Sequence, residues 1–167
     1  DLRDLCQRFL EKDIEYGAHN ITYHEDHPIR GFFLAINNGE KYRITLLSGQ
    51  NYCWKRMVLC KELFHVLLYD DNCRNNSIKN LLEEATTIKL QTEKDKLPYE
   101  PLQWELLAEI AAVEFLFPYQ ERKKKMSGLA SSVEIPDYGA IAEQYKIPRA
   151  IVEQYLSSSR MSVLKDF

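Results

Sequence analysis

The segment 52–69 carries apolar residues on nearly every side of a helical wheel. One continuous arc holds most of them, and Leu59, Leu63 and Val66 cover much of the opposite side. A helix that is apolar all round is stable only where neighbouring elements cover it on several sides. We therefore expect residues 52–69 to form a central, buried helix.

Short β-like stretches precede this helix, at residues 21–24, 31–36 and 42–47. The dipeptide Asn38-Gly39 between the last two is a strong signal for a two-residue hairpin turn. Residues 1–16 instead show an amphipathic helical pattern that Gly17 ends, and we expect further residues to precede Asp1 in the native gene product. The fold class predicted is α+β, with a small antiparallel sheet packed against the buried helix.

Further helices are predicted downstream. An amphipathic pattern spans residues 77–92, a polar loop follows, and residues 101–117 form a helix that begins near Pro101 and that Pro118 ends. Residues 137–156 predict two helices joined by a turn at 146–148, which resembles a helix-turn-helix pair.

The segment 123–132 is basic, then small and polar, and predicts a flexible connector. The expected organisation is a core at residues 1–120, a connector at 121–136 and a C-terminal helical element at 137–167 that packs on the core.

Composition restricts the classes of function. The chain has 167 residues, 45% hydrophobic and 28% charged, and a net charge of −3, which argues against an extended nucleic-acid surface. No apolar run approaches the ~18 residues of a membrane helix. The four cysteines have no disulfide or zinc-ribbon spacing, so we expect a reduced, cytoplasmic location and no membrane contact.

The buried helix carries the candidate chemistry. Lys61 projects into the middle of the apolar arc, His65 lies one turn further along the same face, and Glu62 lies beside it. Only Lys61 departs from the zinc-binding pattern H-E-x-x-H, in which two histidines chelate the metal and the glutamate polarises the bound water. The alternative interpretation is a buried, hydrogen-bonded histidine beside an ordinary salt bridge.

The helix at 101–117 supplies a further candidate. Glu105 shares a stripe with Ala108 and Ala112, and these small residues let another helix approach closely, as a third metal ligand would require. The alternative interpretation is an exposed glutamate in a first helical turn, where the helix dipole favours it.

Three segments together resemble the ImmA/IrrE family of metallopeptidases. Residues 56–68 (R-M-V-L-C-K-E-L-F-H-V-L-L) look like that family's R-F-T-L-A-H-E-L-G-H-L-L-L. Residues 105–118 resemble its E-x-x-A-N-x-F-A-A-E-L-L-M-P segment, and residues 141–152 resemble its closing L-A-x-x-F-x-V-S-x-x-A-V. The resemblance covers residues 31–156 with the motifs in the same order.

This resemblance implies a gluzincin-like zinc site and an action on regulators of stress, phage or mobile-element genes. Carried over, Glu62 matches the general base, His65 the second metal ligand and Glu105 the third. Lys61 stands where the first histidine ligand belongs, and Phe64 replaces a glycine beside the site. The first departure removes a ligand and the second adds bulk near the metal pocket.

The favoured hypothesis is therefore a catalytically degenerate domain that binds a protein partner such as a transcriptional repressor. We expect this domain to need no cofactor. The Lys61 ammonium then offsets Glu62 and Glu105 where zinc would sit.

Two alternatives stay open. In the first, an active zinc peptidase recruits a substitute ligand, for which His24 and His27 are candidates, although the turn-like residues around them favour a surface loop. In the second, the C-terminal helix pair binds DNA through Arg149. The acidic residues Glu143 and Glu153 argue against this alternative, because they would repel the phosphate backbone.

Overall fold

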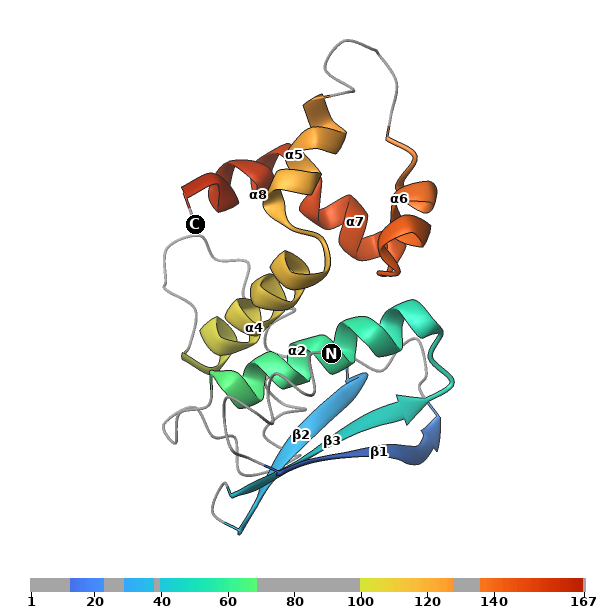
Figure 1. The fold of residues 1–167 in the computed structure, drawn as a ribbon, viewed down its shortest axis with the longest axis vertical. Helices are drawn as coiled ribbons and strands as arrows, with labels where there is room; N and C mark the ends of the chain where they lie inside the picture. The colour runs from blue at the N-terminus through green and yellow to red at the C-terminus, as the bar shows by residue number, and fades with distance from the viewer. Residues whose placement is uncertain (1–12, 23–28, 38–39, 69–99, 128–135, 167) are drawn as a thin grey trace.

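The computed structural model describes residues 13–22, 29–37, 40–68, 100–127 and 136–166, as an α+β arrangement. A three-stranded sheet lies on one side of helix α2, and the remaining helices lie on its other side (Figure 1). The predicted α+β class is confirmed.

The sheet has the order β1-β3-β2. Strands β2 (Gly31–Ile36) and β3 (Lys41–Ser48) pair antiparallel, as predicted for the hairpin. The Glu40 amide donates to the Asn37 carbonyl at 3.2 Å where the chain reverses, while the dipeptide 38–39 lies outside the described residues. Gly31 is required here, because a Cβ atom would lie 2.7 Å from Val58 Cγ1 on α2.

Strand β1 (Asp13–Thr22) corrects two predictions. The helix expected through residue 16 is wrong over residues 13–16, and the sheet is mixed rather than purely antiparallel because β1 pairs parallel to β3. The physical reason is an alternation of period two. Ile14 is buried in the core, whereas Glu15 pairs with Lys41 and Arg43, with 2.9 Å between its Oε2 and Arg43 Nη2.

Helix α2 (Tyr52–Leu67) is the central element, as predicted. The Asn51 side chain caps its start by accepting from the Trp54 amide at 3.0 Å. Leu63 and Val66 belong to the apolar cluster on the sheet, and Met57 belongs to the cluster on the other helices. Two cores on opposite sides explain why this helix is apolar nearly all round.

Helix α4 (Glu100–Leu116) packs against α2 through Ala108 and Ala112, which are completely buried. The close approach expected of this alanine stripe is observed. The predicted helix at residues 77–92 lies outside the described residues.

Helix α5 (Tyr119–Ser127) corrects the expected connector, whose residues 123–127 are helical. The physical reason is Arg122, which the sequence pattern counted as one more exposed charge of a basic segment. It is completely buried, forms an ion pair with Glu114, and donates to the Phe117 carbonyl at 2.6 Å. These contacts hold α5 on the end of α4. Residues 128–135 lie outside the described residues.

The C-terminal helices are α6 (Tyr138–Tyr145) and α7 (Arg149–Tyr155), as predicted, followed by α8 (Ser158–Val163) and a 3₁₀ turn (Leu164–Asp166) that the sequence did not predict. Lys146 turns the chain between α6 and α7 with a positive φ of 54°. Arg56 of α2 donates to the Tyr145 carbonyl at 2.5 Å and so satisfies the end of α6. Within the described residues, no helix is long and apolar enough to cross a bilayer.

Candidate functional site

Two helices bring the sequence-predicted residues together. Helix α2 supplies Lys61, Glu62 and His65, and α4 supplies Glu105. The Glu105 carboxylate lies between the two α2 side chains: Oε2 forms an ion pair with the Lys61 ammonium, and Oε1 lies 3.2 Å from His65 Nε2. Glu105 and His65 are 40 positions apart in the sequence, and the contact expected between them is observed.

Alanines determine this proximity. Ala108 and Ala112 allow the α4 backbone to approach α2 closely, and the Cys60 thiol lies 3.9 Å from the Ala112 carbonyl oxygen. Larger side chains on this stripe would separate the helices and move Glu105 away from Lys61. The helix contact therefore holds the charged groups in position.

The cluster lies at the edge of the core rather than in its centre. The side chains of His65, Lys61 and Glu105 are 10%, 25% and 40% exposed. His65 Nε2 is itself buried and has no well-aligned hydrogen-bond partner within the described part of the chain. Its 3.2 Å distance to Glu105 is therefore a close approach with poor alignment, and one polar atom of the cluster is incompletely satisfied.

Electrostatics keep both Lys61 and Glu105 charged. Burial favours the neutral amine, but the charges of Glu105 and Glu62 outweigh it and raise the pKa of Lys61. Burial likewise acts to raise the pKa of Glu105, but Lys61 and His65 outweigh it and hold that pKa far below its ordinary value. The pair is an ammonium and a carboxylate over the whole physiological pH range.

Glu62 has a different environment, although it is adjacent in sequence. It is buried, with 6% of its surface exposed. Burial raises the pKa of Glu62, and the charges of Lys61 and His65 oppose that effect only in part. A buried carboxyl group with a raised pKa is suited to accept and release a proton, which is a feature of general bases but also of unreactive buried carboxyls.

Aromatic rings complete the surroundings. Phe33 of β2 stacks on the His65 imidazole, with ring centroids 5.7 Å apart and planes 16° apart. Sequence reasoning missed Phe33, because the strand sequence G-F-F-L-A-I has no polar–apolar alternation that would have distinguished it. Phe64, expected to crowd the pocket, contacts Phe115 of α4 edge-on at 6.2 Å.

Glu109, one turn after Glu105 on α4, was also missed. Its Oε1 accepts from the Tyr155 hydroxyl at 2.8 Å and lies 3.6 Å from Arg160 Nη2. Its charge also acts to raise the pKa of Lys61. The C-terminal helices are thus connected to the cluster through one carboxylate.

The described residues at this position supply fewer donors than a catalytic zinc ion needs. Such an ion takes three protein ligands and keeps one open position. Among the described residues, no three histidine, cysteine, aspartate or glutamate side chains gather to hold a metal. Two donors, His65 and Glu105, meet at the predicted position, and Lys61 brings a cation there instead of a third. The candidate substitutes His24 and His27 lie outside the described residues.

Comparison with known proteins does not decide between these possibilities, since no protein-family model matches the chain and no curated protein matches it significantly.

Proposed function

We propose that this chain is a metallopeptidase-like domain of the ImmA/IrrE kind in which the Lys61 ammonium replaces the metal. In this proposal the domain binds a protein partner, such as a transcriptional repressor, without cutting it. The observation that carries the proposal is the Lys61–Glu105 ion pair, with His65 on the second oxygen of the same carboxylate. The identity of the partner class rests on the sequence resemblance.

The charge balance supports this proposal. An ammonium beside Glu105 and Glu62 supplies positive charge where the related zinc site would hold a cation. A lysine binds metal only as the neutral amine, and a raised pKa opposes that form. Lys61 therefore both occupies the position and withholds a lone pair from any metal.

Metal analysis of the purified protein tests the proposal. The unmodified protein should hold less than about 0.1 equivalent of zinc, and Lys61→His should hold about one equivalent, because it adds a nitrogen donor one turn from His65. The matched control is Lys55→His, which places a histidine at an exposed position of the same helix. This control should bind no more zinc than the unmodified protein.

The competing function is an active zinc peptidase with a substitute ligand. It predicts about one equivalent of zinc in the unmodified protein, lost in His65→Ala. It also predicts chelator-sensitive cleavage of an unfolded substrate such as casein, abolished by Glu62→Gln. Observation of both results would replace the proposal with the enzyme.

A further inference from the structure

Helix α8 and the 3₁₀ turn that follows it are held to the other helices by few anchors. None of the six residues of α8, all of which the structure describes, is buried. The preceding helix α7, in contrast, buries Ile151, Val152 and Tyr155. An isolated helix as short as α8 is unstable in water. The position of α8 therefore depends on the contacts of individual side chains.

Two side chains on one face supply those contacts. The Leu164 amide donates to the Arg160 carbonyl, so Leu164 lies one helical turn after Arg160 and on the same face. The Leu164 side chain is 4% exposed and belongs to the larger apolar cluster, which also contains Tyr155. Arg160 Nη2 lies 3.6 Å from Glu109 Oε1 of α4, and its guanidinium carbon lies 5.0 Å from the centre of the Tyr155 ring. The contact thus consists of a leucine in an apolar site and an arginine beside a carboxylate.

The polar half of this contact is incompletely satisfied. A separation of 3.6 Å is longer than a charge-assisted hydrogen bond, which measures about 2.7–2.9 Å. Arg160 Nε is buried and has no hydrogen-bond partner within the described part of the chain. The Tyr155 hydroxyl is the closer donor to Glu109, at 2.8 Å. Because a buried donor without a partner costs free energy, the polar anchor holds α8 only weakly.

We infer that α8 and the 3₁₀ turn form an autoinhibitory strap on a docking site for a protein partner, and that this partner supplies a helix with arginine and leucine four positions apart. The site consists of the Glu109 carboxylate and the apolar surface beside Tyr155. The chain's own segment identifies the chemistry, because it shows which side chains the site accepts. A partner whose arginine approaches Glu109 more closely than Arg160 does would displace the strap.

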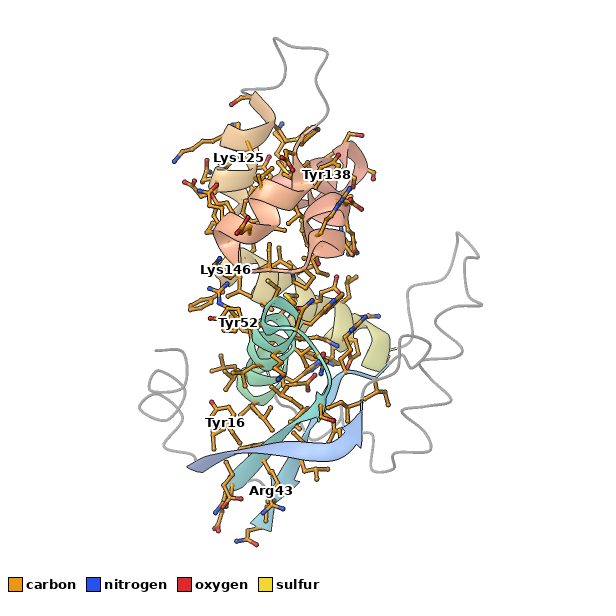
Figure 2. The ribbon with its side chains drawn as sticks, turned by 90° about the vertical axis from the view of Figure 1, so that its right-hand side faces the viewer. Tyr16, Arg43, Tyr52, Lys125, Tyr138 and Lys146 are labelled. Carbon is orange, nitrogen blue, oxygen red and sulfur yellow. The ribbon has the colours of Figure 1, made fainter. Side chains whose placement is uncertain are left out.

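The strap is remote from the sheet. Helices α5 to α8 lie at the opposite end of the molecule, which Figure 2 labels at Lys125, whereas Arg43 marks the sheet. Glu109 also acts to raise the pKa of Lys61, so a partner at this site would change the surroundings of a group that influences the Lys61 cluster. The inference itself does not depend on the function proposed for that cluster.

Hydrogen exchange of the unmodified protein tests whether the strap opens by itself. The amides of Met161 and Leu164 donate within the strap, and those of Val152 and Leu156 donate within α7. The strap amides should be protected at least about tenfold less than the α7 amides, because local opening breaks fewer contacts than unfolding of the core. Equal protection of the two sets would overturn the inference, since α8 would then open only together with α7.

A peptide of residues 157–166 tests the docking site. The protein is the full chain with Leu164→Ala, which removes the apolar anchor of the strap and so vacates the site. In fluorescence anisotropy, the labelled peptide should bind this variant at least about tenfold more tightly than the unmodified protein, in which the chain's own strap competes at a high effective concentration. The matched control is Val163→Ala, which shortens a 60% exposed side chain of the same helix and should bind the peptide as the unmodified protein does.

Substitutions in the peptide and at Glu109 test the chemistry of the partner. In the peptide, Arg160→Gln should weaken binding to the Leu164→Ala protein about fivefold, and Leu164→Ala should weaken it at least about tenfold. Glu109→Gln, added to the Leu164→Ala protein, should also weaken binding of the original peptide about fivefold. The original and Arg160→Gln peptides should then bind this double variant equally well, because the ion pair is already lost.

Two further results would overturn the inference. Equal binding of the peptide to the Leu164→Ala and Val163→Ala proteins would show that the site takes no external helix. Dimers of the unmodified protein in solution, abolished by Leu164→Ala, would assign the site to the exchanged strap of a second copy rather than to another protein.

Discussion

Two ion pairs in two regions of the molecule differ in their surroundings. Lys61 of α2 and Glu105 of α4 pair at the edge of the core, where their side chains are 25% and 40% exposed. Arg149 and Glu153 pair one turn apart on α7, where their side chains are 68% and 43% exposed. Solvent screens a pair of charges more strongly where the pair is more exposed. The comparison therefore predicts that the Lys61–Glu105 pair contributes more to stability than the Arg149–Glu153 pair.

The largest expected effect concerns the Lys61–Glu105 pair, the less exposed of the two. Glu105→Gln removes the negative charge that offsets Lys61, and should lower the free energy of unfolding by about 1–3 kcal/mol, after allowance for the solvent exposure of the pair. Urea denaturation measures the change. The matched control is Arg149→Ala, which breaks the exposed Arg149–Glu153 pair and should cost less than about 0.5 kcal/mol. Equal losses in the two variants would abolish the distinction between the two ion pairs.

The pH dependence of stability gives the next effect. The pKa of Glu105 is lowered in the folded state, so its contribution is present above the ordinary value of 4.5 and is lost as pH falls through the folded pKa. The pKa of Lys61 is raised, so its contribution is present below 10.5 and is lost as pH rises through the folded pKa. The free energy of unfolding should therefore fall as the pH decreases below 4.5 and as it increases above 10.5, and urea denaturation at a series of pH values measures both changes.

Glu105→Gln should flatten the acid slope, because the variant has no carboxyl group at that position to titrate. It should also reduce the alkaline slope, because Lys61 loses its strongest partner. Arg149→Ala should leave both slopes unchanged. An unaltered acid slope in Glu105→Gln would mean that other carboxyl groups control acid unfolding.

The smallest effect concerns Glu62. Its pKa is raised by burial, so the charged form is less favourable in the folded protein than in the unfolded chain at neutral pH. Glu62→Gln should therefore raise the free energy of unfolding at neutral pH by about 0.5–1 kcal/mol, with urea denaturation as the measurement. Below the ordinary pKa of 4.5 the gain should vanish, since both forms are then neutral. A loss of stability at neutral pH would show that Glu62 makes favourable contacts as a carboxylate.

Periodicity predicted most of the described helices and the hairpin. Residues 52–67 and the pair α6–α7 have apolar spacings that neighbours along the chain determine, and these predictions are confirmed. The same spacing placed Lys61 and His65 on one face of α2. The local pattern gave the wrong secondary structure at residues 13–16. The helix predicted for residues 1–16 extended into a segment that forms strand β1.

The sequence by itself determined the buried helix, the strands of the hairpin and the absence of a histidine at position 61, because each depends on residues close together in the chain. Only the tertiary structure decided that Arg122 is buried, that β1 runs parallel to β3, that Phe33 lies on His65, and that Glu105 lies between His65 and Lys61. It also decided the contact between α2 and the end of α6, in which Arg56 donates to the Tyr145 carbonyl 89 positions away. Such contacts depend on how elements pack against one another, and that packing reflects the shapes and charges of distant segments rather than any local period.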